Sequence, residues 1–483
     1  MNFRFRKIKI LVVVTAVIGL SGCASYDLNQ GLGRVNQDAN GFTQNELNFA
    51  KNKEDRGKRL AATNQLLAKP VGQKEAVQLL LANSPAFQAL LAKHWSQAAG
   101  AAQSGRISNP TFAFESVVTG SETELTRFFT FGLLDLITLP QRSAIANFQV
   151  EQAQIRMTAE VVDQVTQVRQ SWVRAVAAAQ SYKYADQVLA SAEASAELAR
   201  RMESVGNFNK LTRARHQAFY ADAATQLATA KQLALLRKEE LIRQLGLDED
   251  QAKQLVLPER LPDLPKQPMT PENVSKQLSQ ERLDIQQAKA ALNAAAKAQG
   301  LNRVTSLTDI ELSVKRSSVA NHSSSRGYEV GVKLPIFDWG DMQRDAMNAQ
   351  TLVAANQLEA TIRSAGSSLR ENYAAYRTAY DISMHYKEEV IPLRKVISEE
   401  NVLRYNGMLI GVFELLADSR DQIGAVISAI EAEQQFWLAD AALQATLIGR
   451  PTSIGVAAIS NTTRNTAAEI GRASCRERVL TGV

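Results

Sequence analysis

The residue whose chemistry is easiest to assign from the sequence is Cys23. It follows Leu20, Ser21 and Gly22, and this Leu-Ser-Gly-Cys string resembles the bacterial lipobox. In a lipobox the cysteine sulfur is the nucleophile that takes a diacylglycerol, and the cysteine becomes the new N-terminus after cleavage. The alternative is an ordinary cleavage site in which the cysteine occurs by chance. We expect Cys23 to be the lipidation site.

The residues around Cys23 support this interpretation. A basic run from Arg4 to Lys9 precedes an apolar run from Ile10 to Leu20. That run is too short to span a bilayer as a helix and fits the apolar region of a secretory signal. We therefore expect residues 1–22 to be a signal peptide and residues 23–73 to form a lipid-anchored N-terminal segment. Residue 24 is alanine, whereas an aspartate at this position would favour retention at the inner membrane. We therefore expect the protein to be transported to the outer membrane.

Other chemically active groups do not form a recognisable catalytic or metal site. The four histidines, His94, His216, His322 and His385, lie far apart and lack the paired spacing of metal ligands, so we expect each to have a surface or packing role. The sequence contains no glycine-rich phosphate loop followed by Lys-Ser or Lys-Thr. No nucleophile elbow and no catalytic carboxylate pair stands out. We expect no enzyme activity, no metal and no cofactor.

The basic pI of about 9.1 comes from the two ends of the chain. Residues 1–22 carry four basic side chains and no acid, and residues 470–483 carry three basic side chains and one acid. These ends account for the whole formal charge of +6. The neutral remainder has no concentrated basic face, which excludes nucleic acid as an expected partner. Residues 470–483, which include Cys475, resemble a translated sequencing adapter, so we do not expect them to be part of the fold.

A proline-rich segment divides the rest of the chain, and the same order of elements appears on each side of it. Five of the 12 prolines lie between Pro258 and Pro271, which indicates an extended linker over residues 248–271. The first repeat, 74–247, has expected helices at 75–103, 141–206 and 209–245 and extended runs at 111–118 and 125–139. The second repeat, 272–449, has expected helices at 271–299, 341–405, with a kink at Pro392, and 413–448, and extended runs at 308–315 and 328–337. Residues 450–469 form a tail.

The expected helices and strands have unusual dimensions. Helices of about 65 residues would span roughly 95 Å, which indicates a coiled-coil assembly or a tube. The extended runs alternate between apolar and polar residues, as in Tyr328, Val330 and Val332 against Glu329 and Lys333. This alternation fits a membrane barrel and a half-buried soluble sheet equally well, and the secretory signal and lipid anchor favour the barrel. Because membrane barrels need at least about eight strands, the four strands require other copies of the chain.

Several short motifs resemble those of the TolC-type outer-membrane factors of Gram-negative bacteria, over nearly all of residues 23–450. They are Asn109-Pro110, the break at Gly206-Asn207, the string from Leu334 to Asp338, and Arg404-Tyr405-Asn406-Gly407 followed by Phe413 to Leu416. The resemblance implies a mostly α fold with a membrane β-barrel portion. It implies a homotrimer whose twelve-stranded barrel lies in outer-membrane lipid and continues into a periplasmic α-helical barrel with an equatorial belt. A periplasmic adaptor and an inner-membrane pump, of the RND or ABC type, would deliver the cargo.

The resemblance also assigns roles by position. The two helix breaks would be periplasmic tips that contact the adaptor, with these residues: Gly206, Asn207, Leu211, Gly407, Met408, Leu409, Ile410, Gly411 and Val412. The alternative is that each break is a plain helical hairpin packed on its neighbour. Aperture gating would involve Arg404, Tyr405, Glu414 and Asp418. Relatives carry a further acid where this chain has Ala417, so the acidic ring is expected to be reduced or displaced.

The expected function is therefore passive conduction in a tripartite efflux or type I secretion system. The competing interpretation is a lipid-anchored periplasmic coiled-coil scaffold without pore activity. The sequence does not specify whether the cargo is a drug, a metal ion or a polypeptide.

Overall fold

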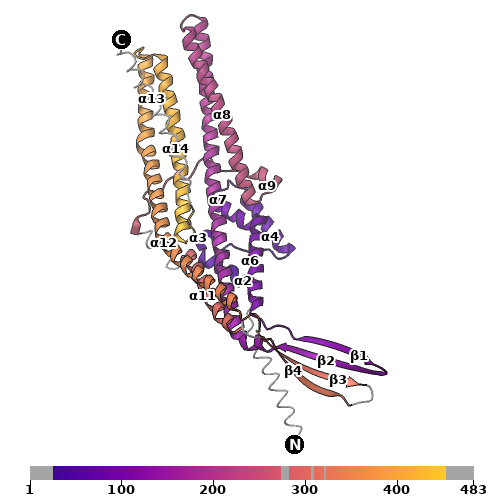
Figure 1. Ribbon diagram of the computed structural model, residues 1–483. Coiled ribbons are helices and arrows are strands. Elements are labelled where there is room, and N and C mark those ends of the chain that lie inside the picture. The colour runs from indigo at the N-terminus through magenta and orange to yellow at the C-terminus, as the bar shows by residue number, and fades with distance from the viewer. Residues whose placement is uncertain (1–25, 273–281, 306–308, 320–322, 335, 453–483) are drawn as a thin grey trace, which may run out of the picture.

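The chain is elongated, with long helices at one end and a small sheet at the other (Figure 1). The computed structural model describes residues 26–272, 282–305, 309–319, 323–334 and 336–452. The expected signal peptide, Cys23 and the C-terminal residues from 453 lie outside these ranges. Within the described residues, no helix combines the length and the hydropathy that crossing a membrane requires.

Both halves of the chain contain the same order of elements. The first half comprises α2 (Leu28–Asp38), α3 (Asn40–Thr43), α4 (Lys53–Leu67), α5 (Gln73–Asn83), α6 (Pro85–Ser104), β1 (Thr111–Thr119), β2 (Glu122–Gly132), α7 (Leu133–Ser204), α8 (Lys210–Leu245) and α9 (Glu249–Gln254). The second half comprises α11 (Leu283–Thr305), β3 (Ile310–Val319), β4 (Ser325–Val332), α12 (Asp341–His385), η1 (Tyr386–Val390), α13 (Ile391–Asn406) and α14 (Val412–Leu447). In each half a helix leads into two strands and then into a long helical hairpin.

The prediction of one helix over residues 75–103 is wrong, because α5 and α6 are separate helices. The helical structure is interrupted at Ser84, whose side-chain oxygen accepts a hydrogen bond from the Phe87 amide at 3.3 Å. Pro85 occupies the first position of α6, where its missing amide hydrogen costs nothing. This serine–proline pair is a helix-start signal that the periodicity of the apolar residues hides.

The second strand is shorter than predicted, and residues 133–139 belong to a helix instead. β2 ends at Gly132, and α7 begins at Leu133 with Asp135 in its first turn, where a carboxylate suits the positive end of the helix. Within this turn the Thr138 hydroxyl donates to the Leu134 carbonyl oxygen at 2.8 Å. Pro140 therefore lies inside α7 and does not end a strand. The apolar alternation had already stopped at Asp135.

The third and fourth strands also differ from their predicted bounds of 308–315 and 328–337. β3 extends to Val319 and β4 begins at Ser325, so most of residues 316–326, which lie between the two predicted runs, is strand. Residues 316 and 317 pair with both β2 and β4, and this two-sided pairing satisfies their backbone groups regardless of side-chain polarity. β4 ends at Val332, and Thr308 and Pro335 lie outside the described residues.

The four strands form one antiparallel sheet in the order β1-β2-β3-β4, so β1 and β4 are open edges. The cross-strand register defines two faces. We call the first the apolar face; near the helices it carries Phe112, Phe114, Phe129, Phe131, Ile310, Leu312, Val314, Tyr328, Val330 and Val332. We call the other the polar face; it carries Glu115, Glu122, Glu124, Glu311, Lys315 and Glu329. Most of the apolar-face side chains are exposed in the single chain.

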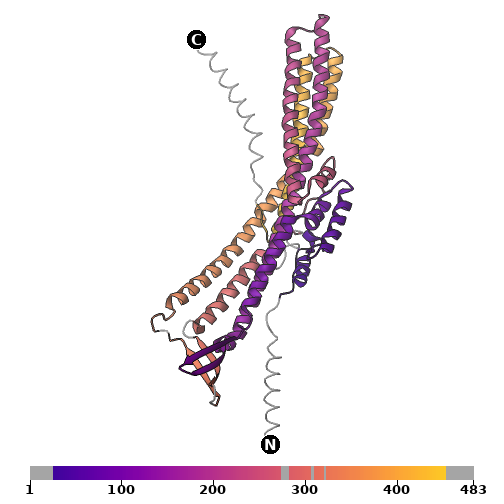
Figure 2. The same ribbon diagram turned by 90° about the vertical axis from the view of Figure 1, so that its right-hand side faces the viewer.

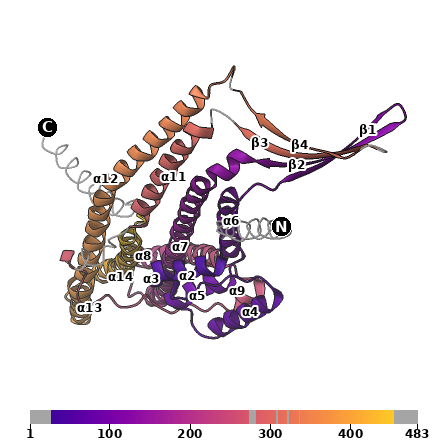
Figure 3. The ribbon, with the colours of Figure 1, turned by 90° about the horizontal axis from the view of Figure 1, so that it is seen from below.

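The main hydrophobic core lies around α7, halfway along the molecule. An apolar stripe at helical spacing on this helix is fully buried, and it comprises Val161, Val165, Val168, Trp172 and Val176. The Trp172 ring nitrogen donates to the Val71 carbonyl oxygen at 2.8 Å, which ties α7 to the N-terminal segment. Seen from below, the short helices α2 to α5 gather beside α7, on the side away from α12 (Figure 3).

The proline-rich linker lies extended against α12 and α14, where aromatic side chains hold its backbone. We call this contact the tyrosine strap; its members are Tyr373, Tyr376 and Tyr380 of α12 and Trp437 of α14. The Tyr376 hydroxyl accepts from the Met269 amide, and the Tyr373 hydroxyl donates to the Met269 carbonyl oxygen, both at 3.1 Å. The Tyr380 hydroxyl lies 3.1 Å from the Pro265 carbonyl oxygen, and Trp437 donates to that of Pro262 at 3.1 Å. Proline has no backbone N–H group, so few backbone donors are available to the carbonyl oxygens of the linker. The tyrosine and tryptophan side chains provide donors in their place.

The helix distortion expected at Pro392 is present as a π-helical turn, η1, between α12 and α13. Pro392 cannot donate a backbone hydrogen bond to the preceding turn, and a missing hydrogen bond of this kind commonly produces a local π-helical turn. The π-helical turn therefore separates the strapped lower part of this helix from the part that reaches the tip.

Candidate functional site at the helix tips

The hairpins α7–α8 and α13–α14 run side by side and turn at the same end of the molecule, far from the sheet. The α7–α8 tip extends beyond the α13–α14 tip in both side views (Figures 1 and 2). These turns contain the residues that the sequence predicted for adaptor contact.

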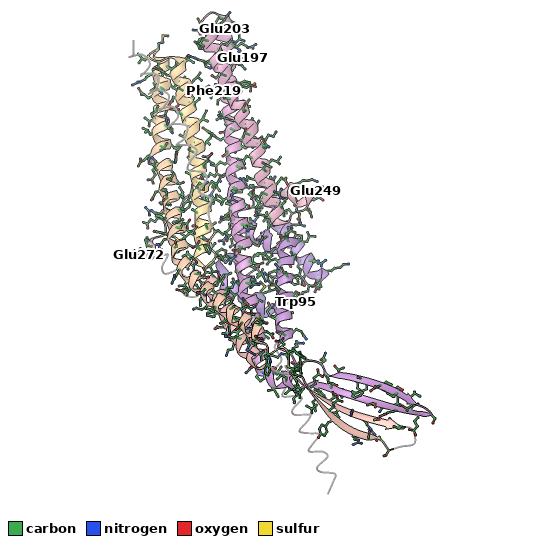
Figure 4. The ribbon with its side chains drawn as sticks, in the orientation of Figure 1. Trp95, Glu197, Glu203, Phe219, Glu249 and Glu272 are labelled. Carbon is green, nitrogen blue, oxygen red and sulfur yellow. The ribbon has the colours of Figure 1, made fainter. Side chains whose placement is uncertain are left out.

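The α7–α8 turn is closed by backbone hydrogen bonds around Gly206. Gly206 has a φ of 80°, a left-handed conformation that glycine adopts without strain. The Asn207 amide then reaches back to the Met202 carbonyl oxygen at 2.9 Å, which is a Schellman-type helix end. Glu203 bridges the two helices through an ion pair with Arg213 at 2.7 Å, and Figure 4 marks Glu203 at this tip.

The α13–α14 turn repeats this geometry, but the left-handed residue is Met408. Gly407, the glycine at the predicted break, has an ordinary φ of −78°, whereas Met408 has a φ of 57°. The Leu409 amide bonds to the Arg404 carbonyl oxygen at 2.8 Å, as in the first tip. Left-handed backbone costs about 1–2 kcal/mol for a residue with a Cβ. Met408 and Leu409 are also 93% and 77% exposed, so the strained turn displays two apolar side chains.

A groove of about 500 Å³ lies between the two hairpins just below the tips. Tyr184, Val188 and Phe219 line one wall, and Tyr405, Leu415 and Leu416 line the other. Phe219 is buried in this contact, and Figure 4 marks its position near the tip of α8. Arg420 of α14 stacks over the Phe219 ring at 5.3 Å and pairs with Asp222 at 3.5 Å. The two hairpins are therefore in contact but not closely packed along this groove.

His216 is a packing residue within this groove. Its Nδ1 lies 2.6 Å from the Ser195 hydroxyl, and the Phe208 ring stacks on it at 6.0 Å. Burial lowers the pKa of His216, so the ring is neutral at neutral pH. Of the other histidines, His94 contacts Glu160 at 2.9 Å, His385 contacts Glu389 at 3.0 Å, and His322 lies outside the described residues. In the described part of the chain, no three acidic, histidine or cysteine side chains gather as metal ligands would.

The predicted gating residues occupy different environments in the single chain. Arg404 pairs with Glu400 on its own helix at 3.3 Å, and both side chains are more than half exposed. Tyr405 lines the groove. Glu414 is exposed on the first turn of α14, whereas Asp418, one turn further on, is only 7% exposed. The Asp418 Oδ2 atom has no hydrogen-bond partner among the described residues. The structure thus does not bring Arg404 together with either acid.

Sequence reasoning missed three contacts, of which two join the two halves and one joins the linker to the second half. Arg450, directly after α14, forms a two-pronged ion pair with Asp163 of α7, with Nε 2.9 Å from Oδ1. Arg169 of α7 donates to the Gln444 side chain at 2.9 Å. The tyrosine strap is the third contact. Only the strap left a signal in the sequence, since Tyr373, Tyr376 and Tyr380 recur at helical spacing opposite the prolines.

Long paired helices that continue into a short open sheet are the architecture of bacterial outer-membrane channels. The same fold occurs in VceC from Vibrio cholerae, an outer membrane protein that is 16% identical, with a TM-score of 0.67 over 81% of this chain and 97% of that one. The CmeC outer membrane channel from Campylobacter jejuni is 14% identical, with a TM-score of 0.67 over 84% of this chain and 89% of that one. The MtrE outer membrane channel from Neisseria gonorrhoeae, in its open state, is 18% identical, with a TM-score of 0.63 over 79% of this chain and 91% of that one.

The sequence itself gives a family match over part of its length. Residues 274–398 match the family described as outer membrane efflux protein. No curated protein matches the chain. Together with the fold, this match confirms the resemblance to the TolC-type outer-membrane factors that the sequence motifs indicated.

Proposed function

We propose that the chain is one subunit of a trimeric outer-membrane channel in a tripartite efflux or type I secretion system. The channel is a passive conduit without enzyme activity. A periplasmic adaptor joins it to an inner-membrane pump of the RND or ABC type, and the lipid on Cys23 anchors it in the outer membrane. The efflux family match and the channel fold support this proposal.

The observation that carries the proposal is the open sheet with one apolar, exposed face. In hydrocarbon, every backbone polar group needs a partner, so the edges β1 and β4 must each pair with another chain. Three copies supply twelve strands, an even number above the minimum for a membrane barrel. The apolar face then contacts lipid, and the polar face, with its five glutamates, lines the lumen.

The tips provide the second part of the proposal, in which the adaptor binds the α13–α14 turn and the groove beside it. Met408 and Leu409 offer apolar surface that a partner could cover, and the groove offers a site between two hairpins. Gly206, Asn207 and Leu211 form the equivalent surface on the first tip. Arg404, Tyr405, Glu414 and Asp418 act in the aperture, where copies of the chain meet around the threefold axis.

Two substitutions at neighbouring residues of β4 test the membrane barrel. Val330→Arg adds a charge to the apolar face, which costs about 2–4 kcal/mol per chain near the bilayer midplane. Glu329→Arg adds the same side chain to the polar face, where it changes ion selectivity instead. We expect wild type and Glu329→Arg to form heat-modifiable trimers that conduct in planar bilayers, and Val330→Arg to fail to assemble. Equal behaviour of the two variants, with no conductance from wild type, would favour the lipid-anchored scaffold.

A further inference from the structure

One row of the sheet carries three arginines side by side on the apolar face. The register pairs Arg127 of β2 with Arg316 of β3, and Arg316 with Arg326 of β4. The fourth member of the row is Phe114 of β1. Because neighbouring strands lie about 4.8 Å apart, the three arginine side chains leave the sheet within about 10 Å of one another. Like charges directly opposite each other destabilise a sheet, so a bound anion would stabilise this row.

The strands themselves supply no anion on that face. All five carboxylates of β1 to β4 lie on the polar face, so the register separates them from the arginines. A long hydrogen bond of 3.5 Å joins Arg316 to the Ser324 hydroxyl, which carries no charge. All three arginine side chains are exposed. The compensating charge must therefore come from outside the sheet.

The position of the row along the strands identifies where that charge lies. Between the helices and the row, the apolar face carries only apolar side chains, over about 20 Å of strand from the pair Ile310–Val332. Ile336 and Trp339, which follow β4 on the way to α12, are exposed as well. Beyond the row the same face becomes mixed, with Ser116, Thr123 and Ser318. The row therefore marks the end of the apolar band that is farthest from the helices, with Phe112, Phe129 and Tyr328 as an aromatic girdle beside it.

We propose that Arg127, Arg316 and Arg326 form a binding row for the phosphate groups of a phosphorylated lipid in the outer leaflet. This inference rests on the proposed function, since it requires the apolar face to contact lipid. Arginine suits the role because its guanidinium group binds phosphate through two parallel hydrogen bonds. A lipid fits better than a soluble anion, because the acyl chains of the lipid would cover the apolar side chains directly below the row.

The test compares trimers of wild type, the Arg127→Gln/Arg316→Gln/Arg326→Gln variant and Lys315→Gln. Lys315 lies on the polar face of the same strand and is the matched control. The probe is diphosphoryl lipid A in mixed micelles, with its dephosphorylated form as the second arm and inorganic phosphate as competitor. Each arginine near an anionic lipid surface contributes a factor of about five, so the triple variant should bind roughly 100-fold more weakly. Lys315→Gln should bind as wild type does.

Three results would overturn the proposal. They are equal binding by wild type and the triple variant, equal binding of the dephosphorylated lipid, and displacement of the lipid by millimolar inorganic phosphate, which would indicate a free-phosphate site. Conductance and heat-modifiable migration of the wild-type trimer are measured on the same preparation. If wild type forms no pore, the proposed function fails; if it conducts but does not bind the lipid, only the binding row fails.

Discussion

The tyrosine strap makes a quantitative prediction about the proline-rich linker. Replacing Tyr373, Tyr376 and Tyr380 by phenylalanine removes the hydroxyl groups that bond to residues 265–269 and keeps the rings. A typical hydrogen bond contributes about 1 kcal/mol to stability, so the triple variant should weaken linker attachment by about 3 kcal/mol. That corresponds to roughly a 150-fold increase in the population of the detached linker. Tyr376→Phe alone should raise it about fivefold.

Limited trypsin digestion measures this detachment directly, because Arg260 and Lys266 are exposed in the linker and neither precedes a proline. Cleavage of a transiently opened segment follows the opening equilibrium when closing is fast. The control is Tyr386→Phe, in the π-helical turn of the same long helix, for which no hydrogen bond to the linker is present among the described residues. We expect the triple variant to be cut roughly 150-fold faster and the control to be cut at the wild-type rate. A triple variant cut within twofold of wild type would refute the strap.

Three further predictions concern the tip, a buried acid and the junction between the repeats. Gly206→Ala should lower stability by about 1 kcal/mol, since alanine is strained at positive φ, whereas Met408→Gly should raise it by up to about 1 kcal/mol; denaturant unfolding measures both. Burial and nearby Asp263 raise the pKa of half-buried Glu433 to about 7, so the folded state holds this proton more tightly than the unfolded state. The free energy of unfolding should therefore fall as the pH rises from about 4.5 to 7, by about 1 kcal/mol, because solvent screens this partly exposed carboxylate. Glu433→Gln should abolish that decline, and an unchanged pH profile would contradict the assignment. Arg450→Ala should lower the free energy of unfolding by about 2 kcal/mol. A double-mutant cycle with Asp163→Ala should assign most of this loss to the interaction between the two side chains.

The helical part of the fold was largely predictable because its signals are local. The break at Gly206-Asn207, the αL residue Gly246 and the distortion at Pro392 each follow from backbone chemistry at one or two residues. The buried stripe from Val161 to Val176 follows from helical periodicity alone. These features depend on neighbours within one or two turns, so the sequence contains them fully.

The strand bounds could be predicted only in part, because pairing with distant strands decides them. Arg316 and Ser317 are polar and read as loop, yet they are strand because β2 and β4 satisfy their backbone on both sides. Residues 133–139 are mostly apolar and were predicted as strand, yet they begin α7 once the partner strands end. In both cases the strands that decide the outcome are distant in the sequence, so a pattern of adjacent residues does not include them.

The sequence by itself determined the periods of the helices, the alternation of the strands and the positions of the two hairpin tips, since each depends on adjacent residues. Tertiary structure alone decided which residues face one another across the chain. It put three arginines from separate strands into one row, set three tyrosines against a linker more than a hundred residues away, and gave the left-handed position to Met408 although Gly407 was adjacent. These outcomes depend on register and packing between distant segments, which side-chain identity at a single position does not fix.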